Sequence, residues 1–417
     1  MKLEIVANGS VTNPAGFKAS GMYAGIKKSV RKFDTTLIVS DVPAVSAGTF
    51  TTSRVKAWPL LHDLQIVKKE RHRAIFANSG NANCFNGPSG ERAVKASLRL
   101  LSQKLGLKSQ EIFLASTGII GRPFPVEKIE QAIPELVKQL SSTGGHDAAR
   151  GILTTDTVPK EIAVRFSVGG KPVTVAAMAK GAGMVTPEMN LAGERSSSLK
   201  GKHATMLCFV TTDLNISKPL LECALETVVG RTFNRLVIDN DQSTNDMVLI
   251  LANGKAGNQK IVSGDQSFQL FQDALEHICI FIARELAKDG EGVKHMCEVL
   301  VKGARTQGEA ESLGRRISSS MLVKTMLAGE DPNWGRVMGC VGASGVDFSP
   351  KLDVLFDGVP VLKNGLGKSE NVGRIREVLK KKEYQLEVNL KCGKASERFW
   401  ATDLTKFYVW INSSYSS

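Results

Sequence analysis

The chain has 417 residues, a formal net charge of +13 and 42% apolar residues. This length suits two domains or one large layered α/β body with a substantial core. No run of 18 apolar residues is free of charge, so we expect no membrane-spanning helix. The N-terminal segment carries an acid at Glu4 and lacks the apolar core and cleavage site of a secretory signal, so we expect a cytoplasmic protein.

Several classes of partner are not expected. The seven cysteines include no C-x-x-C pair and the six histidines no H-x-x-x-H pair, so we expect neither a disulfide framework nor a metal, and no bound cofactor. The basic residues are dispersed, and their densest run, 380–382, has few aromatic side chains around it. Nucleic-acid binding needs basic and aromatic side chains together, so neither nucleic acid nor a membrane is expected as a partner.

The predicted elements alternate along the chain. In the first 60 residues, short apolar runs among Gly, Pro and Asn predict strands at 36–42 and 47–50. Further β-rich runs predict strands at 74–77, 112–115, 162–166, 173–178, 207–212 and 247–251. Apolar residues at helical spacing predict helices at 90–105, 125–140, 220–232 and 268–288. This alternation predicts an α/β or α+β layered fold.

One stretch, 190–203, follows neither period and is rich in Ser, Gly and Lys, so we expect an exposed, mobile loop. Only Ala204 separates this stretch from Thr205, which opens an apolar strand. If the bond before Thr205 is cleaved, the freed α-amine, with a pKa of about 8, lies beside the hydroxyl as its own base. On residue type alone, an ordinary strand threonine remains the commoner explanation.

Eight short motifs favour a catalytic Thr205 over an ordinary strand threonine. They are NSGNAN at 78–83, STGIIG at 116–121, TTDTVPK at 154–160, KGAGM at 180–184, ATML at 204–207, DQSTND at 241–246, DGEG at 289–292 and DPNWGR at 331–336. In this order the chain resembles, nearly end to end, the bifunctional ornithine acetyltransferase family of arginine biosynthesis, also called glutamate N-acetyltransferase.

The resemblance implies an acyltransferase that cleaves itself between Ala204 and Thr205. An N-terminal α chain, 1–204, and a C-terminal β chain, 205–417, then stay associated, and two of each form a heterotetramer. Thr205 accepts acetyl from N-acetylornithine and passes it to glutamate, and some members also use acetyl-CoA. The implied fold is a two-part α/β sandwich with an N-terminal-nucleophile-like site.

The resemblance also assigns roles to individual residues. Thr117 and Gly118 would form the oxyanion hole, through a hydroxyl and a backbone N–H. Lys180 would lower the pKa of the Thr205 amine or bind a substrate carboxylate. The residues that would hold substrate are Thr154, Lys180, Thr205, Glu291, Asn412 and Ser417. By spacing alone, Thr117 and Gly118 also suit a turn after the strand at 112–115, and Lys180 suits a solvated surface position.

Three points stay open. Thr154, Thr155 and Thr157 are all candidates for the substrate contact, and we favour Thr154. Because chain ends usually fray, Asn412 and Ser417 need a tucked-in C-terminus, for which the apolar run FYVWI at 407–411 predicts an anchoring strand.

The third point is the stretch 190–203, which family members lack. This stretch either relieves the strain that an N-to-O acyl shift needs at the Ala204–Thr205 peptide bond, or bulges outwards and leaves that bond undisturbed. We favour the second alternative because Lys180 and the pair Ala204-Thr205 are intact.

One other activity suits the same self-cleaving architecture. An amidase or aminopeptidase would form the acyl-enzyme in the same way but discharge it to water. Transfer to glutamate requires an amine site that outcompetes water, so the two activities differ in the product that carries the acetyl group.

Overall fold

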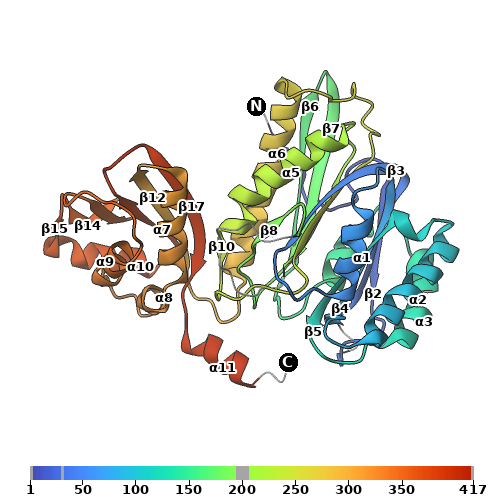
Figure 1. Cartoon of the computed structure of the whole chain (residues 1–417), viewed down its shortest axis with the longest axis horizontal. Helices are drawn as coiled ribbons and strands as arrows, with labels where there is room; N and C mark the ends of the chain where they lie inside the picture. The colour runs from blue at the N-terminus through green and yellow to red at the C-terminus, as the bar shows by residue number, and fades with distance from the viewer. Residues whose placement is uncertain (1–2, 30–31, 194–205, 415–417) are drawn as a thin grey trace. The chain divides into compact units, whose positions relative to one another are not determined.

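The computed structural model describes residues 3–29, 32–193 and 206–414. These residues form two compact units (Figure 1). Unit 1 contains the described residues up to Asn234 together with Gln242–Ile282, and unit 2 contains Arg235–Asp241 and the described residues from Ala283 onwards. Within the described ranges, no helix is long and apolar enough to cross a membrane.

A mixed sheet forms the centre of unit 1, with the main strand order β1-β6-β7-β9-β11-β3-β4-β5 and with β2 and β8 paired to β3. Its strands are β1 (Glu4–Ile5), β2 (Phe17–Met22), β3 (Thr35–Thr51), β4 (His72–Asn81), β5 (Ile112–Ile119), β6 (Lys160–Val168), β7 (Lys171–Lys180), β8 (Met189–Asn190), β9 (Leu207–Thr212) and β11 (Met247–Ala252). Strand β9 is antiparallel to β7 and parallel to β11. Segments from both sides of the predicted cleavage point therefore lie next to each other in one sheet.

Helices cover this sheet. They are α1 (Trp58–Ile66), α2 (Pro88–Leu105), α3 (Val126–Lys138), α4 (Gly145–Gly151), α5 (Lys218–Arg231) and α6 (Gln266–Lys288), the last of which crosses from unit 1 into unit 2. Figure 1 shows α2 and α3 side by side near β4 and β5. Leu101 of α2 and Ile133 of α3 are fully buried in one apolar cluster with Leu114 of β5. This packing holds the β4–β5 end of the sheet in place.

Unit 2 has its own sheet, with strand order β10-β17-β12-β16-β13-β14-β15. The strands are β10 (Leu236–Val237), β12 (Met296–Ala304), β13 (Asp353–Phe356), β14 (Val359–Lys363), β15 (Leu366–Gly367), β16 (Glu383–Asn389) and β17 (Ala395–Thr402). The helices are α7 (Gln307–Ser319), α8 (Met321–Ala328), α9 (Gly335–Gly342), α10 (Val372–Leu379) and α11 (Lys406–Ser414). Leu313 of α7 and Phe399 of β17 are buried in the core of this unit.

The predicted layered α/β fold is confirmed, with two sheets and flanking helices. One difference concerns the strands predicted at 36–42 and 47–50, which are a single strand, β3. Pro43 lies in the gap between the two predicted strands and imitates a turn. In the structure the strand continues, with a register shift against β4 between Val39 and Ala44, and its second half pairs with β11.

Candidate functional site

Thr117 and Lys180, to which the family resemblance gives catalytic roles, meet in unit 1. Thr117 is 0% exposed within β5, and Lys180 is 2% exposed at the end of β7. The Lys180 Nζ atom donates a hydrogen bond to the Thr117 Oγ1 atom at 3.3 Å. Two alternatives considered from spacing are therefore wrong: Thr117 lies inside a strand rather than a turn, and Lys180 is buried rather than solvated. Burying a lysine is costly unless polar groups compensate it, so its position points to a specific role.

Gly118, beside Thr117 in β5, occupies a position that requires glycine. Its φ is +129°, a region that L side chains rarely adopt, and a Cβ atom there would lie 2.5 Å from the backbone carbonyl carbon of Gly80. Gly80 is its partner in the neighbouring strand β4. The missing side chain lets the two backbones approach and fixes the direction of the peptide group after Thr117.

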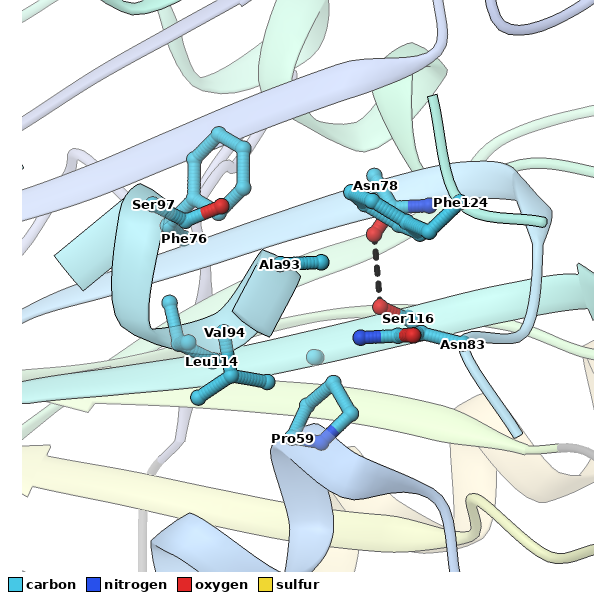
Figure 2. A pocket seen from close by; sticks show the side chains of 11 residues that line it. Pro59, Phe76, Asn78, Asn83, Ala93, Val94, Ser97, Leu114, Ser116 and Phe124 are labelled. Carbon is cyan, nitrogen blue, oxygen red and sulfur yellow. Dashed lines mark hydrogen bonds between the residues drawn. The ribbon is translucent and has the colours of Figure 1, made fainter. Parts of the chain in front are cut away.

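Buried amides support β5 just before Thr117. Figure 2 shows the side chains of Asn78 and Ser116 pointing towards each other beside a water-sized cavity of about 10 Å³, and the Ser116 hydroxyl donates to Asn78 Oδ1 at 2.6 Å. The Asn245 amide donates to the backbone carbonyls of Ser116 and Ala82, at 2.7 and 2.8 Å. Because buried polar groups need such partners, this network holds the backbone at Thr117 in one conformation.

A buried carboxylate, Asp156, contacts the residue that follows Lys180. Its Oδ1 atom accepts hydrogen bonds from Lys160 Nζ at 2.6 Å and from the backbone N–H of Gly181 at 2.8 Å. Its Oδ2 atom accepts the backbone N–H of Thr154 at 3.0 Å. Asp156 therefore joins the TTDTVPK motif to the loop after Lys180. Thr154, Thr155 and Thr157 all line a cavity of about 460 Å³ in this region, so the preference for Thr154 as substrate contact stays a prediction.

Charge stabilises the ionised form of Asp156. Burial alone would raise the pKa of this carboxyl, but the positive charges of Lys180 and Lys160, with the hydrogen bonds to the carboxylate, hold it well below its usual range. A depressed pKa in the folded state stabilises the fold above the unfolded pKa of about 3.9, and this stabilisation is lost as the pH falls below that value.

We therefore expect Asp156→Asn to lower the free energy of unfolding by about 3–5 kcal/mol at pH 7, because it removes the buried negative charge that stabilises the charges of Lys160 and Lys180. Urea unfolding between pH 7 and pH 3 measures this. Below pH 4 the wild-type protein should lose stability more steeply than the variant. The control is Asp147→Asn, at a half-exposed carboxylate on α4, which should change stability by less than about 0.5 kcal/mol. Equal stability of wild type and Asp156→Asn at pH 7 would contradict the assignment.

The predicted nucleophile and cleavage point, Thr205 and Ala204, lie outside the described residues. The residue that follows them, Met206, is fully buried, and its backbone N–H donates to Asp246 Oδ1. The next residue, Leu207, is the cross-strand neighbour of Lys180. The first described residues of the predicted β chain are therefore held beside the lysine that contacts Thr117.

Two predicted substrate residues meet in unit 2. The Asn412 side-chain amide donates to Glu291 Oε2 at 3.0 Å. Gly292 has a φ of +67°, and a Cβ atom there would lie 2.4 Å from the backbone nitrogen of Tyr408, so glycine lets helix α11 approach the DGEG loop closely. The Thr405 hydroxyl also donates to the Gly292 carbonyl at 2.6 Å. The third predicted C-terminal contact, Ser417, lies outside the described residues.

The strand predicted at 407–411 is wrong, because these residues belong to helix α11. The Thr405 hydroxyl accepts the backbone N–H of Tyr408 at 3.1 Å and so caps the start of the helix. Phe407 and Trp410, at i and i+3, stack with ring centroids 5.4 Å apart. They are 56% and 61% exposed and do not provide the expected buried anchor; the contact of Gly292 with α11 holds this segment instead.

Asp156, Lys160 and Asp246 are site residues that the sequence reasoning missed. Asp156 and Lys160 both lie in the TTDTVPK motif, whose threonines are the predicted substrate contacts. Their spacing of four residues is the one sequence signal that indicates an ion pair between them. Asp246 ends the DQSTND motif, and nothing in its sequence position indicates that it accepts the backbone N–H of Met206.

No metal or cofactor is assigned to the site. Across residues 3–29, 32–193 and 206–414, no group of three or more His, Cys, Asp and Glu side chains gathers in a way that could hold a metal ion.

Comparisons with known sequences cover nearly the whole length of the chain. Residues 18–417 match the ArgJ family. The arginine biosynthesis bifunctional protein ArgJ of Symbiobacterium thermophilum is 41% identical over 98% of both chains. The glutamate N-acetyltransferase of Methanocaldococcus jannaschii is 41% identical over 99% of this chain and 100% of its own. A crystal structure of ornithine acetyltransferase from Mycobacterium tuberculosis, complexed with ornithine, is 35% identical, with a TM-score of 0.43 over 45% of this chain and 100% of the other.

Proposed function

Because this chain belongs to the ArgJ family and is an acetyltransferase of arginine biosynthesis, we propose that it moves acetyl from N-acetylornithine to glutamate through an ester on Thr205. Thr205 becomes available when the precursor cleaves itself after Ala204. The observation that carries the proposal is the buried hydrogen bond of 3.3 Å between Lys180 and Thr117. It lies beside Gly118, whose backbone packs closely against Gly80.

Self-cleavage begins with an attack of the Thr205 hydroxyl oxygen on the carbonyl carbon of Ala204. The new C–O bond replaces the peptide C–N bond, and the departing nitrogen takes up the hydroxyl proton. Water then hydrolyses the resulting ester, which leaves a carboxylate on Ala204 and restores the hydroxyl of Thr205, now with a free α-amine. The position of Leu207 opposite Lys180 supports this assignment, because it places the start of the β chain beside the candidate catalytic groups.

Transfer uses the same oxygen. The α-amine of Thr205 accepts the hydroxyl proton while the oxygen attacks the acetyl carbonyl of N-acetylornithine. The Thr117 hydroxyl and the Gly118 N–H stabilise the resulting oxyanion. The C–N bond then breaks, ornithine leaves with the proton, and acetyl remains on Thr205. The amine of glutamate attacks this ester in the reverse sequence and releases N-acetylglutamate.

Lys180 has a second proposed effect. A positive charge near an amine lowers the pKa of that amine, since two like charges repel. With Lys180 protonated, the Thr205 α-amine is more often neutral near pH 7 and so able to accept the hydroxyl proton. The buried position of Lys180 supports this, because Coulomb interactions are stronger away from water.

Substrate recognition in this proposal uses Thr154, Glu291, Asn412 and Ser417. A carboxylate suits the side-chain ammonium of ornithine, and amide and hydroxyl groups suit a substrate carboxylate. The hydrogen bond between Asn412 and Glu291 supports a shared role, because it orients the Glu291 carboxylate.

We expect Glu291→Gln to lower kcat/KM for N-acetylornithine by more than ten-fold, or about 1.4 kcal/mol, because the neutral amide no longer pairs with the ammonium. Steady-state kinetics with N-acetylornithine varied measures this. The control, Glu370→Gln, alters an exposed glutamate in the same unit and should leave the kinetics unchanged. An unaltered kcat/KM in Glu291→Gln would mean that this carboxylate only binds Asn412.

Acetyl-CoA as a second donor and an assembly of two α and two β chains are further parts of the proposal. Acetyl-CoA would acetylate the same Thr205 oxygen with the thiol of CoA as leaving group. Light scattering of the cleaved protein would measure the mass of the assembly. The precursor has a mass of 45.0 kDa, and the assembly should have about twice that mass.

Incubation with N-acetylornithine, with and without glutamate, tests the proposed reaction. N-Acetylglutamate should form when glutamate is present, with little free acetate in either case. Release of acetate at the same rate with and without glutamate would contradict transfer and favour an amidase.

A further inference from the structure

One buried lysine, Lys324, takes no part in the proposed reaction. It lies on helix α8 of unit 2, shortly before the DPNWGR motif at 331–336, and it is 1% exposed. Burying an ammonium group is costly unless hydrogen bonds and opposite charges compensate it. The contacts of Lys324 therefore indicate which segment of unit 2 it stabilises.

The Lys324 side chain binds the last residue of strand β17. Its Nζ atom donates hydrogen bonds to the backbone carbonyl of Thr402 at 2.5 Å and to the Thr402 hydroxyl at 3.1 Å. The Thr402 hydroxyl in turn donates to the carbonyl of Ile238 at 2.9 Å. The backbone carbonyl of Lys324 accepts the N–H of Leu404 at 3.1 Å. The side chain and the backbone of one residue therefore hold the segment 402–404 in place.

Two negative charges lie near this ammonium group. Burial lowers the pKa of Lys324 to about 8, and the charges of Asp239 and Asp403 oppose this shift. Because the pKa stays above 7, the side chain is mostly protonated at neutral pH. A protonated lysine has three N–H donors, and Thr402 accepts two of them.

The residues after Thr402 support the DGEG loop at 289–292. The Asp403 Oδ1 atom accepts the backbone N–H of Lys294, just after this loop, at 3.0 Å. Thr405 donates its hydroxyl to the loop and also caps helix α11. One short segment, held by Lys324, therefore joins the loop that carries Glu291 to the helix that carries Asn412.

The DPNWGR motif holds the same helix α8. The Arg336 guanidinium donates to the backbone carbonyl of Leu322 at 2.7 Å and to the Thr325 hydroxyl at 3.1 Å. These two residues lie on either side of Lys324 in the sequence, so Arg336 helps to fix the helix from which the lysine projects.

We propose that Lys324 is a positioning residue for substrate binding, which keeps Glu291 and Asn412 in contact through the segment 402–405. The proposal rests on the proposed function, in which these two residues recognise N-acetylornithine. Lys324 acts through the backbone of this segment and not by contact with the substrate. Without the ammonium group, the DGEG loop and α11 lose their common support, and the substrate binds more weakly.

Steady-state kinetics of Lys324→Met, which removes the ammonium group and keeps most of the side-chain length, tests this role. We expect KM for N-acetylornithine to rise about ten-fold or more, with kcat within about three-fold of wild type, because only substrate binding depends on the pair. Thr402→Val keeps the shape without the hydroxyl and should raise KM by a smaller factor. The control, Lys351→Met, removes an exposed lysine of unit 2 and should leave both constants unchanged.

A double variant distinguishes positioning from a general loss of stability. If Lys324 acts through Glu291, adding Lys324→Met to Glu291→Gln should lower kcat/KM by less than about three-fold, because the contact that Lys324 positions is already lost. Hydrogen exchange gives a readout that needs no activity. Backbone amides at 406–414 should exchange faster in Lys324→Met than in wild type, and at the wild-type rate in Lys351→Met.

Three results would overturn the proposal. They are an equal effect of Lys324→Met on kcat/KM in the wild-type and Glu291→Gln backgrounds, a fall in kcat with KM unchanged, and unchanged exchange at 406–414. If Lys324→Met does not fold, Thr402→Val takes its place, and an unchanged KM with unchanged exchange would equally overturn the proposal. If wild type fails to use N-acetylornithine, the proposed function fails, while exchange at 406–414 still decides whether Lys324 holds α11.

Discussion

Thr205→Ala should remain a single chain of 45.0 kDa and show no acetyl transfer. Without the hydroxyl, nothing attacks the carbonyl of Ala204, so no peptide bond is exchanged for an ester and no N-terminal amine is freed. The same oxygen carries the acetyl group, so the loss of transfer should be on the order of 10⁴-fold or more, as for other essential nucleophiles. Denaturing electrophoresis and a transfer assay measure the two effects.

The matched variant Thr205→Ser keeps a hydroxyl at this position. It should cleave slowly and retain part of the transfer activity, since the chemistry needs the oxygen and the missing methyl alters only its orientation. A Thr205→Ala protein that still splits into two fragments would show that another residue starts the cleavage. A fully active but uncleaved Thr205→Ala protein would remove Thr205 from both steps.

Thr117→Ala should lower kcat for transfer by about 10²–10³-fold, the usual effect of removing one oxyanion donor. Self-cleavage should slow as well, because its intermediate at the Ala204 carbonyl also carries an oxyanion. We expect these effects because the Thr117 hydroxyl is buried and its hydrogen bond with Lys180 holds it in place. Rates of precursor cleavage and of steady-state transfer give the two values.

A control separates this role from a structural one. Thr117→Ser keeps the hydroxyl and should retain most of the turnover, whereas Thr117→Val keeps the shape and should lose turnover like Thr117→Ala. Urea unfolding should show all three variants folded at pH 7. Full turnover in Thr117→Ala would exclude the hydroxyl from the mechanism.

Several strands of unit 1 could be predicted from sequence because they contain short apolar runs bounded by turn residues. The prediction at 207–212 matches β9 throughout. The predicted end of β5 at Ala115 is wrong, because Ser116, Thr117 and Gly118 read as a turn. Pairing with β4 extends the strand through them, and tertiary pairing of this kind has no signal in a local window.

Candidate site residues could be named from the sequence where a motif resembles the family, but their burial could not be predicted. Lys180, between an apolar strand and a glycine, reads as a surface lysine, and only its antiparallel pairing with Leu207 makes it internal. Asp156 lies four residues before Lys160 in the TTDTVPK motif, but nothing in the sequence shows that it also accepts hydrogen bonds from the backbone at 154 and 181. In 407–411, β-forming residues predicted a strand, but the cap at Thr405 and the contact with Gly292 favour a helix.

The most direct test of the central claim is the intact mass of the purified wild-type protein before and after incubation with N-acetylornithine alone. Before incubation we predict two fragments that meet between Ala204 and Thr205. Afterwards the C-terminal fragment should gain one acetyl group, about 42 Da, and the N-terminal fragment none, because the ester forms on the new N-terminal residue. A single uncleaved chain, or an acetyl group on the N-terminal fragment, would contradict the account.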